Sequence, residues 1–215
     1  MSEKTRETDA KGIPLKEGPY PPSFNVFIMY PLMNIIFASL MGYIAHKFIV
    51  IPNTNTSKEK IAFLAKHDLG YLYLSLIVLR IGQLIMATIS GNARKQTRVH
   101  PPDQHIYKIH GQEKMGYVFL DQSGKNGNFN RAQRAIANYQ ETFPQYALYI
   151  VASGLIYPKQ VFGLVILFAV SRVLSAVGYT SSTNGRMGGF MISQLTAATL
   201  ESLTAIIAYK ALHFE

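Results

Sequence analysis

Four polar residues are spaced so that a helix would carry them on one face. Counted from Arg134, the side chains of Asn138, Glu141 and Gln145 follow four, seven and eleven positions later. At about 3.6 residues per turn, these offsets place all four in one narrow stripe. Such a stripe can line a polar site, or it can join neighbouring helices through ion pairs. The spacing alone leaves both interpretations open.

Three arginines are expected to meet at the same end of the helices. Arg94, Arg134 and Arg186 each lie close to the end of an apolar segment. Arginine binds carboxylates through two parallel N–H···O bonds, so three converging guanidinium groups indicate an anionic ligand with carboxylates. Taken singly, an arginine at such a position is more often an anchor for lipid headgroups.

A second polar face follows in the next apolar segment. Arg172 and Tyr179 are seven residues apart, with Ser175 between them, so a helix places the three on one side. Arg172 lies deep in its segment and needs a partner, for which Glu201 is the acidic candidate, with Arg80 competing for the same carboxylate. Tyr179 lies at the segment boundary, where aromatic residues are common in membrane proteins.

The composition excludes several other chemistries. The chain has no Cys, so disulfides, thiolate metal sites and cysteine nucleophiles are excluded, and any thiol must arrive with the substrate. His100, His105 and His110 recur every five residues, which is not a compact metal-ligand spacing, and no metal site is predicted. The net charge of +9 comes mostly from basic residues at the ends of apolar runs. No signature of nucleic-acid binding accompanies them, so membrane topology explains the charge better.

The apolar residues gather into five runs that are long enough to cross a membrane, since a spanning helix needs roughly 20 mainly apolar residues. The runs are Phe24–Ile51, Leu69–Ser90, Ala135–Ile156, Val161–Tyr179 and Phe190–Leu212. We therefore predict an all-α membrane protein.

The segments between the runs are predicted to be loops. Asn53–Lys66 and Gly91–Asn130 are the longest, Pro158–Gln160 is a tight turn, and Ser181–Gly189 is short and rich in glycine. Gly91–Asn130 is longer than a helix hairpin needs, so we expect it to contain ordered structure of its own.

Charge counts predict how the chain lies in the membrane. With five spans, the N-terminal tail and the loops 91–130 and 181–189 share one side, which carries 13 Lys and Arg against 6 on the other. The positive-inside rule places the more basic side in the cytosol, or in the matrix if the membrane is mitochondrial. The polar, mixed-charge tail is not expected to be a cleavable signal peptide or a transit peptide.

Three motifs resemble those of the MAPEG family, which includes microsomal glutathione transferases, leukotriene C synthase and the lipoxygenase-activating protein. The stretch FNRAQRAIANYQETFP at Phe129–Pro144 fits the family pattern Arg-Ala-(His or Gln)-x-Asn-x-x-Glu-x-x-Pro at Arg134, Ala135, Asn138, Glu141 and Pro144. ARKQTRVHPP at Ala93–Pro102 resembles the basic end of the family's first helix. SRVLSAVGYTSSTNGR at Ser171–Arg186 resembles its third helix and the following loop. The resemblance covers about residues 69–212 and is nearest in kind to the type three microsomal glutathione transferases.

The resemblance implies a domain organisation and an assembly. It implies a polar tail at 1–23, an extra transmembrane helix at 24–52 and a four-helix transmembrane bundle at 69–215, with an extended loop at 91–130. Members of the family form homotrimers and bind glutathione between neighbouring subunits, near the cytosolic face.

The resemblance also implies a site and an activity. By motif position, Arg94, Arg134, Asn138, Glu141 and Tyr179 would contact glutathione as co-substrate, and Arg186 would stabilise its thiolate. The expected function is that of a glutathione transferase or peroxidase acting on lipophilic electrophiles or lipid hydroperoxides. An endoplasmic reticulum membrane is favoured, with a mitochondrial membrane as the alternative.

The sequence departs from the family in four places. Ile136 replaces the usual His or Gln, and Ser175 and Thr142 stand where many members have Tyr. The loop Asp103–Asn128 is longer than usual, and Phe24–Ile51 is an extra span. These departures keep two alternatives open. One is a non-catalytic accessory subunit of a larger membrane complex, and the other is lipid binding without catalysis.

Overall fold

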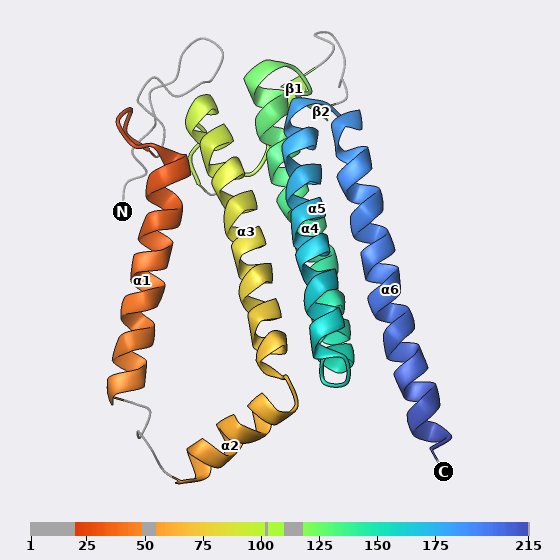
Figure 1. Cartoon of the computed structure of the whole chain (residues 1–215). Coiled ribbons are helices and arrows are strands. Elements are labelled where there is room, and N and C mark those ends of the chain that lie inside the picture. Colours follow the sequence, from red (N-terminus) through yellow and green to blue (C-terminus); the bar gives the residue numbers. More distant parts are fainter. Residues whose placement is uncertain (1–19, 49–54, 102, 110–117, 215) are drawn as a thin grey trace.

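The computed structural model describes residues 20–48, 55–101, 103–109 and 118–214. Long helices run side by side and form most of the molecule (Figure 1). In chain order the elements are α1 (Val26–Phe48), α2 (Asn55–Lys66), α3 (Gly70–Thr97), β1 (Tyr107–Ile109), β2 (Val118–Leu120), α4 (Gly124–Gly154), α5 (Pro158–Ser181), the 3₁₀ turn η1 (Asn184–Arg186) and α6 (Met187–Leu212). The prediction of an all-α membrane protein is confirmed, apart from one two-stranded hairpin.

Among the residues that the structure describes, four helical segments are long and apolar enough to cross a membrane. They are α1, α3, α5 and the continuous stretch of η1 and α6. The remaining predicted span, Ala135–Ile156, corresponds to α4, which has 31 residues and lies alongside the others (Figure 1). Its N-terminal half carries the polar stripe, which lowers its hydropathy. The position of α4 in the bundle therefore follows from packing more than from apolar character.

Two of the predicted loops contain regular structure. Asn53–Lys66 was expected to be a loop, and this is wrong, because Asn55–Lys66 forms α2. This helix has no buried residue and exposes Ile61 and Phe63 beside several charges, a composition typical of a helix that lies on a membrane surface. The loop between α3 and α4 holds the antiparallel pair β1 and β2, so the expectation of ordered structure there is confirmed.

Helix ends also differ from the ends of the apolar runs. The helix α3 continues to Thr97 and α4 begins at Gly124, both inside the predicted loop. Ala93 on α3 and Phe129 on α4 are buried in one small cluster, which holds these polar extensions together. Pro158 was expected in a turn but begins α5, where its missing N–H is not needed.

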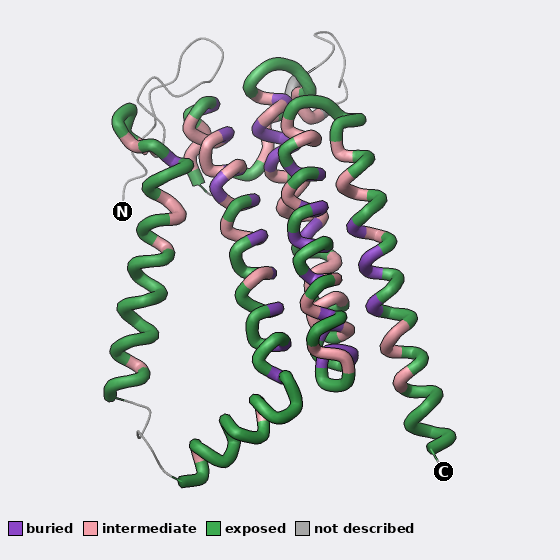
Figure 2. Tube along the Cα trace, in the orientation of Figure 1, coloured by how far each residue is buried: buried purple, intermediate pink, exposed green. Residues whose placement is uncertain are grey.

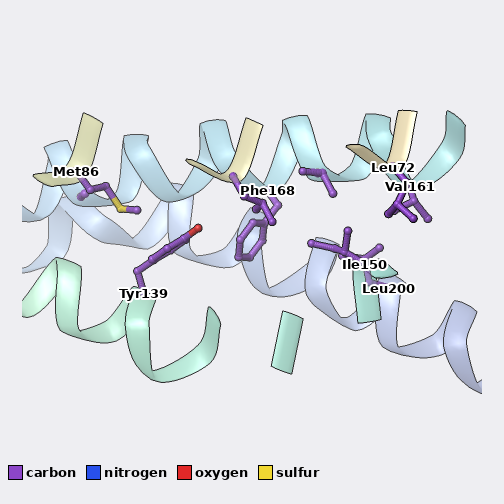
Figure 3. Packing of buried hydrophobic residues seen from close by; sticks show 10 residues of the cluster. Leu72, Met86, Tyr139, Ile150, Val161, Phe168 and Leu200 are labelled. Atoms are coloured by element: carbon purple, nitrogen blue, oxygen red, sulfur yellow. The ribbon is translucent and has the colours of Figure 1, made fainter. Parts of the chain in front are cut away.

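The core lies where α3, α4, α5 and α6 meet. Its buried residues include Met86, Tyr139, Phe168 and Leu200, one from each helix (Figure 3). The outer faces of the same helices expose Leu, Ile, Val and Tyr side chains, and exposed positions recur along the outside of each helix (Figure 2). In a bilayer these faces contact lipid tails, which are as apolar as the side chains themselves.

The extra helix α1 packs on α3 near one end only. Val26 is its only buried residue, and the Lys95 Nζ of α3 donates hydrogen bonds to the backbone oxygens of Pro22 and Phe24, at 2.8 and 2.7 Å. The rest of α1 diverges from α3 toward its far end (Figure 1). The helix is thus attached to the bundle at the end that carries the predicted site.

Close packing of α5 against α6 depends on a glycine. A Cβ placed at Gly189 would lie 2.5 Å from both the Ser171 O and the Ser175 N of α5, whereas one at Gly188 would meet nothing within 4 Å. Contacts of 2.5 Å to backbone atoms cannot be relieved by a side-chain rotation, so the two helices would have to separate.

We predict that Gly189→Ala lowers the stability of the folded bundle by about 1–3 kcal/mol, the usual cost of overpacking. Gly188→Ala is the matched control, and it should be neutral or slightly stabilising because alanine favours the helix. Thermal unfolding in detergent micelles measures both variants. Equal shifts in the two would contradict the close contact.

Candidate functional site

A small pocket lies among the bundle helices near the turn between α5 and α6. Its lining residues come from α3, α4, α5, η1 and α6, namely Met86, Ala135, Asn138, Arg172, Ser175, Ala176, Tyr179, Arg186 and Phe190. The space measures about 20 Å³, which is room for roughly one water molecule. Three of the predicted site residues, Asn138, Tyr179 and Arg186, therefore meet at one place.

Arg186 is held over the ring of Tyr179. Its guanidinium carbon lies 5.0 Å from the ring centroid, within the range of a cation–π contact. The backbone oxygen of Arg186 accepts a hydrogen bond from the Ser175 Oγ at 3.2 Å. The Ser175 hydroxyl thus holds the turn that carries Arg186.

The turn can fold back on α5 because two glycines meet there. A Cβ on Gly178 would lie 2.1 Å from the Gly185 O, and a Cβ on Gly185 would lie 2.3 Å from the Gly178 O. Backbone therefore packs directly on backbone at this point. This contact brings η1 close to Tyr179.

Arg172 is buried, with 6% of its surface exposed, and its contacts differ from the expected ones. Its Nη2 donates a hydrogen bond to the backbone oxygen of Asn138 at 2.9 Å, and its guanidinium lies 5.6 Å from the Tyr139 ring centroid. The predicted ion pair with Glu201 is wrong, since no described carboxylate lies within 4 Å of Arg172 and Glu201 is exposed on α6. A carbonyl and aromatic faces stabilise the buried cation instead.

Arg134 and Glu141 form an ion pair outside the pocket. The Arg134 Nη1 and the Glu141 Oε1 are 3.1 Å apart, and about half of each side chain is exposed, at 52% and 56%. Asn138, which lies between them in sequence, lines the pocket. One ion pair therefore links Arg134 and Glu141, the two charged members of the polar stripe predicted from the spacing. Both of these side chains face outward.

Arg94 does not join the pocket within one chain. Its Nη1 donates hydrogen bonds to the backbone oxygens of Asp103, at 2.8 Å, and Val99, at 3.3 Å. Its guanidinium carbon lies 5.1 Å from the ring centroid of Phe129. The three arginines that were expected to converge are therefore in three different settings: Arg186 in the pocket, Arg134 on the outer face and Arg94 beside the loop.

Comparison with protein-family models matches residues 72–206 to the MAPEG family. The chain belongs to the MAPEG family. The match begins in α3 and ends in α6, so it takes in the four-helix bundle and excludes α1 and α2. Proteins of this family are membrane proteins of glutathione and eicosanoid metabolism, and its members in general use glutathione.

The departures from the MAPEG motif make structural contacts. Ile136 packs against the main core cluster. The Thr142 Oγ1 donates to the Asn138 O of its own helix at 3.1 Å, and this oxygen also accepts the Arg172 hydrogen bond. Ile136 and Thr142 thus support the helices and do not line the pocket.

Arg131 has a role that the sequence did not reveal. It is buried, and its Nε and Nη2 both donate to the Thr180 O, at 3.2 and 3.0 Å, while Nη1 donates to the Gln122 O at 2.9 Å. Nη2 also lies 2.6 Å from the Asn128 Oδ1. This guanidinium therefore joins the start of α4 to the last turn of α5. Residue type and spacing cannot distinguish such a clamp from a ligand-binding arginine.

We predict that Arg131→Lys lowers the free energy of unfolding by about 2–4 kcal/mol, because an ammonium group cannot reproduce the several hydrogen bonds that the planar guanidinium group donates in different directions. Thermal unfolding in micelles provides the measurement, with Arg98→Lys as the matched control at an exposed position. An unfolding temperature for Arg131→Lys equal to that of the control would show that the clamp contributes little.

Proposed function

We propose that this protein is a membrane-bound glutathione transferase or peroxidase that acts on lipophilic electrophiles or lipid hydroperoxides. The observation that carries the proposal is the placement of Arg186 over Tyr179 in a pocket that Asn138 also lines. In the family pattern these positions bind glutathione, and family membership makes glutathione the expected thiol. The absence of Cys from the chain fits a reaction in which the thiol is brought by the substrate.

The proposed chemistry follows from a cation beside sulfur. A nearby positive charge favours the thiolate over the thiol and so lowers the thiol pKa. In the transferase reaction the thiolate attacks an electrophilic carbon and forms a thioether, and the electron pair of the broken bond leaves with the displaced group or, in addition to an activated double bond, takes up a proton at the adjacent carbon. In the peroxidase reaction it attacks the terminal oxygen of the hydroperoxide and forms an alcohol and a glutathione sulfenic acid, which a second glutathione converts to the disulfide and water. Arg186 is the residue we assign to thiolate stabilisation in both reactions.

One chain alone offers too little space for this ligand. About 20 Å³ accommodates one water rather than a tripeptide, and Arg134 and Glu141 lie on the outer face beside the pocket. We propose that a neighbouring copy completes the site and that its Arg94 supplies a further contact to glutathione. Within the described part of the chain, one nitrogen of Arg94 donates to backbone oxygens, and its other N–H donors are the ones we assign to the ligand.

The second substrate would reach the site from the bilayer. The outer faces of α5 and α6 expose Val177, Met187 and Met191 close to the pocket residues Tyr179, Arg186 and Phe190. A lipophilic molecule dissolved in the membrane can therefore approach without crossing water. We place the protein in the endoplasmic reticulum membrane, with a mitochondrial membrane as the alternative.

Replacing Arg186 with Ala should raise the pKa of the bound glutathione thiol toward the value of about 8.5 found for free thiols. The cation that favours the thiolate is removed, and each unit of increase leaves about tenfold less thiolate at neutral pH. Thiolate formation is followed by its ultraviolet absorbance while purified protein with glutathione is titrated with alkali.

The matched control is Lys125→Ala, which removes an exposed cation from the first turn of α4 at the same end of the bundle. Its titration midpoint should equal that of the unchanged protein, below 8.5. The proposal is wrong if the unchanged protein fails to bind glutathione at millimolar concentration, or if its thiol titrates like free glutathione.

A second function is favoured by the replacement of a polar motif residue with Ile136 and by the almost fully exposed helix α1. In that alternative the chain is a non-catalytic accessory subunit of a larger membrane complex, and α1 contacts the other subunits. Purification from native membranes in a gentle detergent distinguishes the two. The accessory function predicts stable association with other proteins, and a self-contained assembly of this chain would exclude it.

A further inference from the structure

Two opposite charges lie on the outside of the chain, in the middle of two spanning helices. Arg80 on α3 and Glu201 on α6 are both exposed; Arg80 stands between Leu79 and Ile81, and Glu201 stands between Leu200 and Ser202. The Arg80 Nη1 donates to the Gln83 Oε1 of its own helix at 3.0 Å. Among the described residues, no carboxylate lies within 4 Å of Arg80 and no cation lies within 4 Å of Glu201.

The two charges lie at a similar depth. Arg80 is ten residues from the Gly70 end of α3, and Glu201 is eleven residues from the Leu212 end of α6. At 1.5 Å per residue these separations are about 15 and 16 Å, and the two helix ends lie at the same end of the bundle (Figure 1). Each charge is therefore near the centre of a hydrocarbon layer about 30 Å thick.

Lipid is a poor environment for either group. Charged residues at this depth are costly, and in known membrane proteins they face a protein interior, a water-filled cavity or a partner of opposite charge. Extension of the side chain to the surface relieves the cost only near the ends of a helix. Both residues thus indicate protein contact on their exposed faces.

The partner cannot come from the same bundle. The helices α4 and α5 lie between α3 and α6 and pack against both (Figure 1). Arg80 and Glu201 therefore project from two different flanks of the chain. One flank carries the positive charge and the other carries the negative charge, so the two flanks are complementary in charge.

The two charges lie on surfaces of different shape, since large side chains surround Arg80 and small ones surround Glu201. On α3, the large side chains of Tyr73 and Ile77 share the face of Arg80 and are exposed. On α6, the small residues Ala198, Ala205 and Ala208 share the face of Glu201 and are also exposed. Small residues allow a neighbouring helix to approach closely, and large ones on that neighbour fill the space.

We propose that α3 of one copy docks against α6 of the next copy, with Arg80 paired to Glu201 across the contact. The contact joins two unlike surfaces, so every copy offers one Arg80 face and one Glu201 face. A head-to-tail contact of this kind closes into a ring where the rotation between successive copies closes, and in such a ring no charge stays unpaired. The pairing does not depend on glutathione, so it stands or falls separately from the proposed function.

Charge reversal tests the pair. Arg80→Glu and Glu201→Arg should each weaken self-association in mild detergent by about 100-fold or more, because like charges then face each other in a low-dielectric contact. The doubly reversed chain restores opposite charges and should associate like the unchanged protein, as measured by light scattering during size-exclusion chromatography. Failure of the double reversal to restore association, or unchanged association of both single variants, overturns the pairing.

Crosslinking tests whether the contact lies between copies, and the absence of Cys from the chain removes background. Two differently tagged copies, one with Arg80→Cys and one with Glu201→Cys, are co-expressed and treated with a short membrane-permeant bis-thiosulfonate. A mixed product at twice the chain mass of 24.0 kDa is expected. The matched control uses Ile81→Cys, exposed at nearly the same depth but on another face. The proposal is overturned if Arg80→Cys crosslinks no better than this control, or if a chain with both cysteines crosslinks only within itself.

Discussion

The guanidinium of Arg131 is bonded at once to the end of α5, to the segment before α4 and to a side chain of α4 itself. The last carbonyls of a helix have no partner within the helix, and the Thr180 O is one of them. Arg131, which lies on α4, donates hydrogen bonds to this oxygen and so fixes where α4 and α5 meet. Tyr179 precedes Thr180 directly, and Asn138 lies two turns below Arg131, so the geometry of the pocket follows from this contact.

Apolar segments predict the spanning helices because lipid leaves the backbone few alternatives to a helix. The same rule says nothing about helices outside the lipid. Thus α2 was missed, since its apolar residues around Ile61 and Phe63 are too few to span, and the ends of α3 and α4 were cut short. There the helix is maintained by local burial of Ala93 and Phe129, which hydropathy does not detect.

For the candidate site, too, the sequence predicts one property of the residues and misses another. Offsets along a helix predict which residues share a face, and Arg134 and Glu141 do meet. They do not predict which partner a long side chain selects. Arg172 was expected to pair with Glu201, but the Asn138 carbonyl and the Tyr139 ring are nearer to its buried guanidinium. Likewise, nothing in the sequence distinguishes Arg131, which binds backbone, from Arg186, which reaches the pocket.

The lengths of the helices have a consequence for the membranes that the chain can occupy. With 23 residues, α1 is about 34 Å long, longer than the roughly 27 Å hydrocarbon layer of the endoplasmic reticulum. Within the described residues it is held to α3 near Val26, so it can tilt to match a thin bilayer while the four-helix bundle keeps its shape. Adaptation to bilayer thickness is therefore concentrated in the helix that lies outside the family match.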